Sequence, residues 1–519
     1  MNRRDFLKGC TATGILMATS CREPTMTPTE KIKTHSGNIQ GEIVDGVHRF
    51  LGVPYAEPPF GERRWRAPEL RQPWQGTLSA TSYGPICPQT GGIQANAPDE
   101  GEDCLSLNIW SPDTHTQGLP VMVWAHGGGQ VSGSGANATY DGTHFAKDGV
   151  VLVTCNRRLG AEGFLYLEEH FGEGVGPGNL GIQDLICVLE WVALNIEQFG
   201  GNPNNVTLFG ESGGAAATQA VVATPGSKGL VHKVIVQSGG HAAQLPGTAK
   251  AVADLMLSEL GEDGLSYNAL QNVPWHRLVE LYPVLEKQQV KLGRPQIYLP
   301  VINSHMPVHP ADTAHEKVGL DIDYLIGTCR DEMNFFSSFI PELRDTIFHN
   351  RAKRVLECSG VSFDDLTRVY QANRPHLDED GVFEAILGDL WFRVPSIRIA
   401  EGHAAANQAK TYMYLFEWES NLIGAAHALD LMVFGNGLPI PGIAGFADYQ
   451  NTAATMRRAW INFAKEGNPS SEQLAWSQYG EGKSVMSLNE TSQLLLNPFQ
   501  AEQQLLSSVI QRSWRVAGL

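Results

Sequence analysis

Residues 206–223 read VTLFGESGGAAATQAVVA and contain the segment that decides the fold. The apolar run of residues 206–209 predicts a buried strand, and the Ala-rich run of residues 215–223 predicts a helix. Between them, the glycines of a Gly-x-Ser-x-Gly pattern permit a sharp turn that a Cβ would obstruct. Such a turn presents its serine above the edge of a sheet, so Ser212 is a candidate nucleophile. A chance glycine-rich turn is the alternative, because this chain has 55 glycines.

A second glycine-rich segment, His126-Gly127-Gly128-Gly129, follows the apolar run of residues 119–125 (LPVMVWA). Glycines without side chains allow backbone N–H groups to point into a cavity, where they suit the oxyanion of a tetrahedral intermediate. A flexible loop is the alternative. The triplet lies upstream of Ser212, as an oxyanion loop does in sheets of this kind, so the two segments support each other.

Strand-like and helix-like segments alternate along the chain. The predicted strands are continuous apolar runs, as in strands buried on both faces: residues 119–125, 150–155, 206–209, 234–236, 324–326 and 412–416. Residues 179–199 have apolar residues at helical spacing, and residues 32–53 predict a small antiparallel meander. This alternation predicts an α/β fold with a mostly parallel central sheet and helices on both faces. Residues from about 245 to 320 and from about 335 to 405 are more helical and charged, which indicates insertions over the sheet.

Composition and charge exclude several classes of function. The chain has 519 residues, with 38 Lys and Arg against 55 Asp and Glu, and a net charge of −17. This acidic balance disfavours a nucleic-acid partner, because phosphate binding needs clustered basic side chains. No segment offers about 18 consecutive apolar residues, so no transmembrane span is expected. The chain contains neither a Cys-x-x-Cys pair nor a His-Glu-x-x-His motif, and we expect no metal and no organic cofactor.

Residues 1–20 read MNRRDFLKGCTATGILMATS and are arranged like an export signal, with a basic start, a short apolar run and small residues. The Arg-Arg-x-Phe-Leu-Lys string resembles a bacterial twin-arginine signal. Residues 18–21 loosely resemble a lipoprotein processing site, which would leave Cys21 as a lipidated first residue. A cleaved signal with Cys21 incidental is the alternative. We expect residues 21–519 to form a single large domain in the periplasm or cell envelope of a bacterium.

Export would place the cysteines of the mature chain in an oxidising compartment, where a close pair is a disulfide candidate. Cys87 and Cys104 enclose a loop that is rich in Gly, Pro and Asn and has no strand or helix pattern. Closing this loop would add on the order of 3 kcal/mol of stability through the unfolded state. Two free, buried thiols are the alternative.

These motifs and several others resemble the type B carboxylesterase family, which includes the cholinesterases and the bacterial para-nitrobenzyl esterases. The resemblance covers nearly all of the mature chain and rests on residues 50–56 (FLGVPYA), 87–89 (CPQ), 102–108 (EDCLSLN), 178–184 (GNLGIQD), 195–203 (NIEQFGGNP), 209–214 (FGESGG) and 460–464 (WINFA). It implies the α/β-hydrolase fold, one catalytic domain and a disulfide between Cys87 and Cys104. It also implies that Ser212 is the nucleophile and that the N–H groups of Gly128, Gly129 and Gly213 form the oxyanion hole.

The chain order of this fold, nucleophile then acid then histidine, indicates where the rest of a catalytic triad lies. By resemblance the acid is Glu332, with Asp331 as the runner-up, and a carboxylate there can hold an imidazole in the correct tautomer. The resemblance and the small neighbouring residues select His427 as the base. His126 is its rival, but it precedes the serine and belongs to the oxyanion segment.

Two further residues, Glu211 and Ser238, are expected to support the triad. Glu211 directly precedes the nucleophile, and Ser238 matches a second serine of the family. A polar strand end is the alternative role for Ser238. The family usually has Asn where Cys329 stands and Gly where Met333 stands, so the surroundings of the acid depart from the family pattern.

The resemblance implies a serine carboxylic-ester hydrolase that works through an acyl-enzyme intermediate. Cholinesterases hold a quaternary ammonium against a Trp of the disulfide loop. Residues 88–103 here contain no Trp, Tyr or Phe, so a choline ester is disfavoured and a neutral or apolar ester is expected. The residue after the glycine triplet, often aromatic in the family, is Gln130, which leaves the lining of the acyl pocket open.

Two alternatives to a carboxylic-ester hydrolase remain. The same mechanism would also serve an amide, a thioester or a specialised natural-product ester. A non-catalytic adhesion protein on the same scaffold, like the neuroligins, would lack the nucleophile. Because Ser212, Glu332 and His427 are all present, the sequence disfavours that second alternative.

Overall fold

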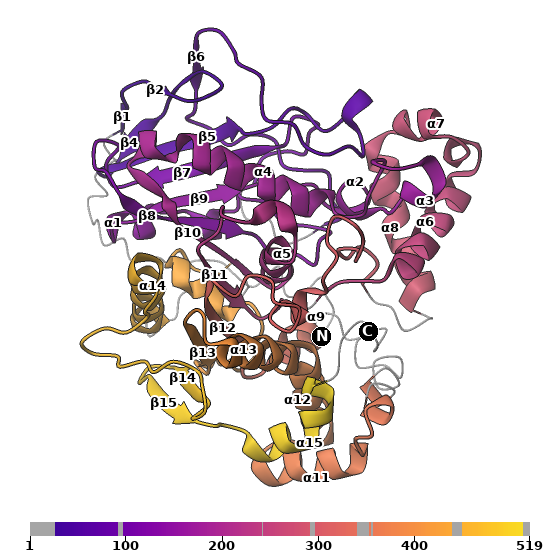
Figure 1. Cartoon of the computed structure of the whole chain (residues 1–519), viewed down its shortest axis with the longest axis vertical. Coiled ribbons are helices and arrows are strands. Elements are labelled where there is room, and N and C mark those ends of the chain that lie inside the picture. Colours follow the sequence, from indigo (N-terminus) through magenta and orange to yellow (C-terminus); the bar gives the residue numbers. More distant parts are fainter. Residues whose placement is uncertain are drawn as a thin grey trace, which may run out of the picture.

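The computed structural model of the chain describes residues 26–91, 97–240, 242–290, 296–339, 352–353, 356–438 and 449–511. Among these residues, the longest sheet has twelve strands in the order β1-β4-β5-β7-β9-β8-β10-β11-β12-β13-β14-β15 (Figure 1). The export signal and Cys21 lie outside the described residues, so both stay predictions.

The strands of the long sheet are β1 (Met26–Pro28), β4 (Glu42–Val44), β5 (Val47–Pro54), β7 (Ser106–Ser111), β8 (Leu119–Ala125), β9 (Val151–Cys155), β10 (Gly201–Glu211), β11 (Lys233–Gln237), β12 (Asp323–Cys329), β13 (Thr411–Phe416), β14 (Ser484–Leu488) and β15 (Gln493–Leu496). From β9 to β14 in sheet order, neighbouring strands are parallel. The remaining strands add antiparallel pairs at both ends of the sheet. The mostly parallel sheet predicted from the sequence is therefore confirmed.

A small second sheet consists of β2 (Ile32–Lys33), β3 (Asn38–Gln40) and β6 (Thr77–Ser79). The meander predicted for residues 32–53 is thus divided between two sheets, because β4 and β5 pair within the long sheet. Alternation alone identified the strands there, but it did not identify their partners.

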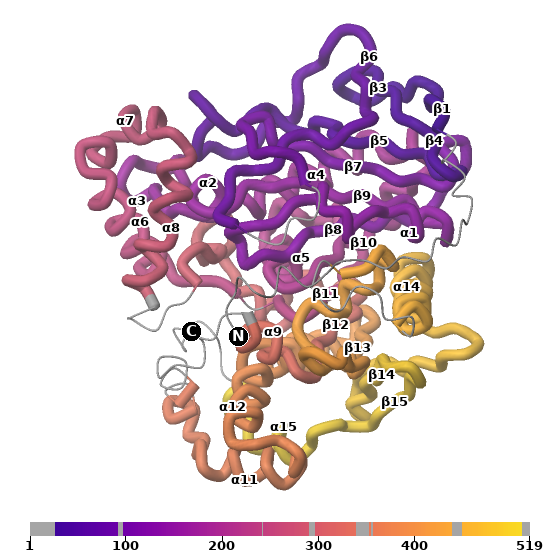
Figure 2. Tube along the Cα trace, turned by 180° about the vertical axis from the view of Figure 1, so that it is seen from behind, coloured from indigo at the N-terminus to yellow at the C-terminus, as the bar shows by residue number. Residues whose placement is uncertain are grey.

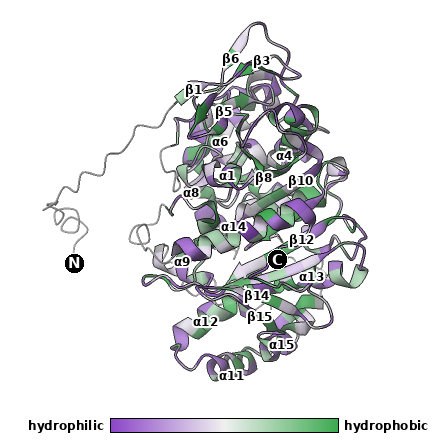
Figure 3. Ribbon diagram, turned by 90° about the vertical axis from the view of Figure 1, so that its left-hand side faces the viewer, coloured by the Kyte–Doolittle hydropathy of each residue, from purple (hydrophilic) through white to green (hydrophobic). Residues whose placement is uncertain are grey.

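Helices lie on both faces of the long sheet, as predicted. The α-helices are α1 (Thr143–Lys147), α2 (Gly160–Phe164), α3 (Glu168–Phe171), α4 (Leu180–Asn195), α5 (Gly213–Val222), α6 (Pro246–Leu260), α7 (Tyr267–Gln271), α8 (Trp275–Val290), α9 (Met333–Phe339), α11 (Phe363–Asn373), α12 (Glu379–Gly388), α13 (Val394–Ala406), α14 (Tyr449–Glu466) and α15 (Gln500–Gln511). In Figure 3 these helices carry both hydrophobic and hydrophilic residues, as expected for elements between a core and solvent.

The parallel strands are apolar along their length because successive side chains enter two different cores. On β8, Val123 belongs to the core shared with α4 and α5, whereas Trp124 belongs to the core shared with α1 and α14. Both side chains are fully buried. This burial on two faces explains why the strands read as continuous apolar runs.

The predicted insertions form two separate groups of helices. Helices α6, α7 and α8 gather beside α2 and α3, whereas α11 and α12 gather with α15 in the lower part of the molecule (Figures 1 and 2). Helix α13 lies within the second predicted insertion but packs directly on β12 and β13, as a covering helix of the long sheet. Its buried residues Val394, Ile397 and Ile399 belong to the same apolar core as Met413 of β13.

Cys87 and Cys104 are both buried, but as free thiols, so the predicted disulfide is not present. The two side chains are neighbours. The pKa of the Cys87 thiol is raised mainly by burial and also by a hydrogen bond with Cys104. The sequence spacing correctly placed the two cysteines together. It does not determine the oxidation state, which depends on the redox potential of the surroundings.

The residues selected from the sequence lie at one edge of the long sheet. Parallel strands have their carboxyl ends at the same edge, and ligands of α/β sheets bind there. The segments selected from the sequence follow β8, β10, β12 and β13 directly or within one loop. The topology therefore places His126–Gly129, Ser212, Glu332 and His427 at a common edge.

Candidate active site

Ser212 lies on the sharp turn between β10 and α5, with φ of 55° and ψ of −121°. This conformation is rare for a residue with a side chain and is typical of functional positions. Glycines make the turn possible: a Cβ on Gly214 would lie 1.9 Å from the Ala125 carbonyl oxygen. The Ser212 amide donates to the Gln237 carbonyl at 2.9 Å, which fixes the turn to β11. The elbow predicted from the Gly-x-Ser-x-Gly pattern is therefore present.

The glycine triplet after β8 approaches this turn closely. Gly128 and Gly129 have φ of 101° and 61°, which favours glycine at both positions. A Cβ on Gly213 would lie 2.7 Å from the Gly129 nitrogen, so the two segments are in contact. Within the described chain, the amides of Gly128, Gly129 and Gly213 have no protein acceptor. They remain available for a ligand oxygen, beside the N-terminus of α5, where the helix dipole also favours negative charge.

His427 lies in the loop after β13 and contacts the acid selected from the sequence. Its Nδ1 is 2.6 Å from Glu332 Oε2, and the other carboxylate oxygen, Oε1, accepts the Cys329 amide at 2.8 Å. Both His427 and Glu332 are buried. The carboxylate is thus held at both oxygens, an arrangement that fixes the orientation of the imidazole.

Asp331, the runner-up acid, has a different position. Its Oδ2 accepts the Ala425 amide at 3.0 Å and contacts Arg330 at 2.7 Å. The Asp331 amide in turn donates to the Ala425 carbonyl at 2.9 Å. Asp331 therefore joins the turn that carries Glu332 to the loop that carries His427, and it does not contact the imidazole.

Glu211 contributes a second carboxylate to the imidazole, since its Oε1 lies 3.1 Å from His427 Nε2. Burial would lower the pKa of His427, but the charges of Glu211 and Glu332 outweigh it and raise this pKa above its usual value. Burial also raises the pKa of Glu211, although His427 opposes that shift. Because both pKa values are raised, the pair formed by Glu211 and His427 tends to keep a bound proton.

Asp430 and Ser238 lie behind the catalytic candidates. Asp430 is completely buried and accepts the Tyr414 hydroxyl at 2.9 Å. Ser238 donates to Cys329 Sγ at 3.9 Å, and the Cys329 amide donates to Glu332, so the link from Ser238 to the acid passes through Cys329. The supporting role expected for Ser238 is therefore indirect at most in this geometry.

His126, the rival histidine, is fully buried, and its Nδ1 lies 2.9 Å from the Gly127 carbonyl oxygen. Burial and the neighbouring Arg157 lower its pKa to about 3, so it is neutral at ordinary pH. It holds the oxyanion segment and does not contact Glu332. The structure thus brings Glu332 together with His427, as predicted.

Sequence reasoning missed an aromatic wall around the base. The ring centroids of Phe336 and Phe392 lie 4.9 Å from that of His427, and Phe335 lies at 6.0 Å. Phe392 belongs to a π-helical turn, Asp389–Arg393, between α12 and α13. Two of these residues follow Glu332 closely enough to have been suspected. Phe392 could not have been found, because only the tertiary fold brings α12 to this edge.

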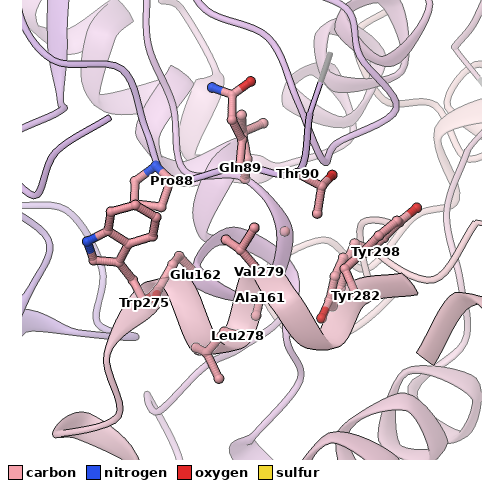
Figure 4. A pocket seen from close by; sticks show the side chains of 12 residues that line it. Pro88, Gln89, Thr90, Ala161, Glu162, Trp275, Leu278, Val279, Tyr282 and Tyr298 are labelled. Atoms are coloured by element: carbon pink, nitrogen blue, oxygen red, sulfur yellow. The ribbon is translucent and has the colours of Figure 1, made fainter. Parts of the chain in front are cut away.

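A separate small pocket lies between α8 and the loop after Cys87 (Figure 4). One face of α8 lines it with Trp275, Leu278, Val279 and Tyr282, and the pocket contains none of the catalytic candidates. In the part of the chain that the structure describes, no cluster of His, Cys, Asp and Glu is suited to a metal ion. None of the described helices is long and apolar enough to span a membrane.

Comparison with known proteins adds to this geometry. Residues 28–507 match the carboxylesterase family. The para-nitrobenzyl esterase of Bacillus subtilis is 35% identical over 463 residues, which cover 87% of this chain and 92% of that protein. Phenmedipham hydrolase of Pseudarthrobacter oxydans is 32% identical, with coverages of 85% and 91%.

A solved structure shows the same architecture. The carboxylesterase of Geobacillus stearothermophilus superimposes with a TM-score of 0.81 at 34% identity, covering 92% of this chain and 99% of that one. The sequence match, the superposition and the mostly parallel sheet agree with one another. The chain therefore belongs to the carboxylesterase family and is a serine ester hydrolase with the α/β-hydrolase fold.

Proposed function

We propose that the protein hydrolyses neutral or apolar carboxylic esters with Ser212, His427 and Glu332 as its catalytic triad. The contact of 2.6 Å between His427 Nδ1 and Glu332 Oε2, at the sheet edge that carries the Ser212 elbow, is the observation that best supports this proposal. Glu332 accepts a hydrogen bond from the Nδ1–H of His427, which keeps the proton on Nδ1 and leaves Nε2 as the basic nitrogen. Nε2 then takes the proton of Ser212 as Oγ attacks the ester carbonyl carbon.

The attack converts the carbonyl oxygen to an oxyanion. The amides of Gly128, Gly129 and Gly213 are the donors proposed to hold it, and losing one such donor typically raises the barrier by about 3–4 kcal/mol. His427 returns its proton to the leaving alcohol as the carbon–oxygen bond breaks. Water then attacks the acyl-Ser212 ester by the same route and releases the acid.

The surroundings of His427 support an apolar substrate. Phe336 and Phe392 pack against the imidazole and offer hydrocarbon surface rather than charge at this position. The described part of the loop after Cys87 contains no aromatic side chain that would hold a quaternary ammonium. An uncharged acyl or aryl ester fits this chemistry better than a choline ester.

Covalent labelling tests the proposed nucleophile. A fluorophosphonate should attach to the folded protein in a 1:1 ratio and block hydrolysis of para-nitrophenyl acetate, and peptide mapping should find the label on Ser212. Heat-denatured protein is the control, because the activated serine requires the folded triad. Labelling of the native protein at another residue, or equal labelling after denaturation, would refute the proposal.

The pH dependence of kcat/KM should reflect the two carboxylates beside the base. Catalysis needs neutral His427, and because its pKa is raised, kcat/KM should increase with pH along a limb above the usual 6.5. Glu211→Gln removes one charge that raises this pKa, so the limb should move to lower pH. Glu190→Gln, an exposed carboxylate on α4, serves as the control and should leave the limb in place. An unmoved limb in Glu211→Gln contradicts the assignment.

Export of the enzyme is part of the proposal. The basic start, the short apolar run and the Arg-Arg-x-Phe-Leu-Lys string of residues 1–20 support a twin-arginine route to the periplasm or cell envelope. Cys21 is the candidate lipid anchor at the end of this signal.

A further inference from the structure

Gln130, directly after the glycine triplet, joins segments on both sides of the proposed oxyanion hole. It is 1% exposed and has φ of 69°, an uncommon conformation for a residue with a side chain. Its Nε2 donates to the Gly213 carbonyl at 2.8 Å, across from the glycine loop to the start of α5. Its own carbonyl accepts the Gly160 amide at 2.8 Å. Gln130 thus fixes the loop to α5 and to α2 at the same time.

Arg157 fixes the side chain of Gln130 from the other side. It is fully buried, and its Nη1 donates to Gln130 Oε1 at 2.7 Å. Its Nη2 donates to the His126 carbonyl at 3.2 Å, just before the glycine triplet. A guanidinium can only donate and a carbonyl can only accept, so the amide of Gln130 has a single favourable orientation between Arg157 and Gly213.

Arg157 differs from its neighbour Arg158 in having no carboxylate partner among the described residues. Arg158 pairs with Asp184 at 2.6 Å, whereas the hydrogen-bond acceptors of Arg157 are neutral oxygens. Its Nε is buried and unpaired. Burial lowers the pKa of Arg157 to about 10, which still leaves it charged at neutral pH. A buried positive charge is costly, and retaining one without a counter-ion is typical of a functional position.

We propose that Gln130 and Arg157 are positioning residues that set the geometry of the oxyanion hole and place a positive charge behind it. Gln130 sets the separation between the glycine loop and Gly213, and Arg157 keeps the Gln130 amide in the required orientation. The negative charge of the tetrahedral intermediate then develops on the side of a guanidinium that forms no ion pair among the described residues. This inference rests on the proposed function, because it assigns a role around the same intermediate.

The test compares transition-state stabilisation with substrate binding in Gln130→Met, which keeps the size of the side chain and removes both hydrogen bonds. We expect kcat/KM for para-nitrophenyl acetate to decrease by about 10- to 100-fold, less than the effect of deleting a donor outright, with KM changed by less than about 3-fold. A trifluoromethyl ketone, whose carbonyl adds Ser212 Oγ and leaves an oxyanion in the hole, should bind more weakly by the same factor as kcat/KM. The matched methyl ketone should bind with nearly unchanged affinity.

Gln89→Met is the matched control. Gln89 is also buried and holds the same loop, but from the side of Cys87: its Oε1 accepts the Gly133 amide at 2.8 Å, and its Nε2 donates to the carbonyls of Cys87 and Gly133. Both variants should lose thermal stability, whereas only Gln130→Met should weaken the trifluoromethyl ketone selectively. Equal effects of the two variants on that ketone, or an unchanged kcat/KM in Gln130→Met, would overturn the proposal.

Two further variants test the charge and remain informative if Gln130→Met does not fold. Gln130→Glu keeps an acceptor for Arg157 but neutralises its charge and turns an oxygen toward Gly213, so kcat/KM should decrease at least as much as in Gln130→Met. Arg157→Lys keeps the charge and should retain more activity than Arg157→Met. Activity in Gln130→Glu equal to that of the parent, or equal activities of the two Arg157 variants, would contradict the proposal. Fluorophosphonate labelling of every variant distinguishes the two proposals. If the variants are labelled stoichiometrically, the Ser212 nucleophile is intact, and a contradictory kinetic result then refutes only the roles of Gln130 and Arg157.

Discussion

Replacing Ser212 by alanine is expected to reduce kcat for para-nitrophenyl acetate by at least about 10⁵-fold. Without the hydroxyl no acyl-enzyme can form, and loss of the nucleophile removes the action of the whole triad. Alanine has a Cβ like serine, so the strained turn at φ of 55° is unchanged and the thermal unfolding temperature should stay within a few degrees. Steady-state kinetics and thermal unfolding of the same preparation measure both quantities.

Ser227→Ala is the control for this substitution. Ser227 is a buried serine just beyond the other end of α5, where its hydroxyl donates to the Val221 carbonyl at 2.7 Å. Loss of that bond should lower stability and leave kcat within about 2-fold, because the residue is far along the helix from the sheet edge. If Ser212→Ala retained a tenth of the parent activity, another residue would be the nucleophile.

Replacing Glu332 by glutamine is expected to lower kcat by about 10³- to 10⁴-fold through the tautomer of His427. The two carboxylate oxygens of Glu332 accept from the Cys329 amide and face His427 Nδ1. In the glutamine variant, the amide oxygen must face the Cys329 N–H, which turns the NH₂ group toward Nδ1. Nδ1 must then accept, so the proton of neutral His427 moves to Nε2, the nitrogen that has to take the proton of Ser212. Steady-state kinetics with para-nitrophenyl acetate measures the loss.

Asp331→Asn distinguishes the two candidate acids. Asp331 bonds the Ala425 amide and Arg330, so its substitution should loosen the His427 loop and reduce kcat by less than about 10-fold. The unfolding temperature should decrease in this variant more than in Glu332→Gln. A larger kinetic loss in Asp331→Asn than in Glu332→Gln would reverse the assignment of the acid.

Local chemistry explains why much of the site could be predicted. The Ser212 elbow and the glycine triplet are recognisable because tight turns exclude side chains. Glycines therefore stand at neighbouring positions of the sequence, where they can be read directly. Glu332 and His427 were found through a resemblance and through chain order. Neither would have been chosen from composition, since the chain has 16 histidines and 55 acidic residues.

Contacts between distant segments explain what could not be predicted. Phe392 packs on His427 from a π-helical turn, and Arg157 reaches Gln130 from the loop after β9. No periodicity links these residues to the site, because each pairing depends on how helices and loops pack above the sheet. The same limit explains why α13 was assigned to an insertion and why the meander of residues 32–53 was assigned to a single sheet.

By itself, the sequence determined the alternation of apolar strands and helices, the strained serine turn and the bare amides of Gly128 and Gly129. These features depend on residues next to one another, where steric exclusion and hydrophobic burial act within one element. Only the tertiary structure decided which carboxylate faces His427, that Glu211 lies 3.1 Å from its other nitrogen, and that a buried Arg157 holds Gln130. Charge and hydrogen-bond geometry act over a few ångströms in space, and the fold alone determines which residues come within that distance.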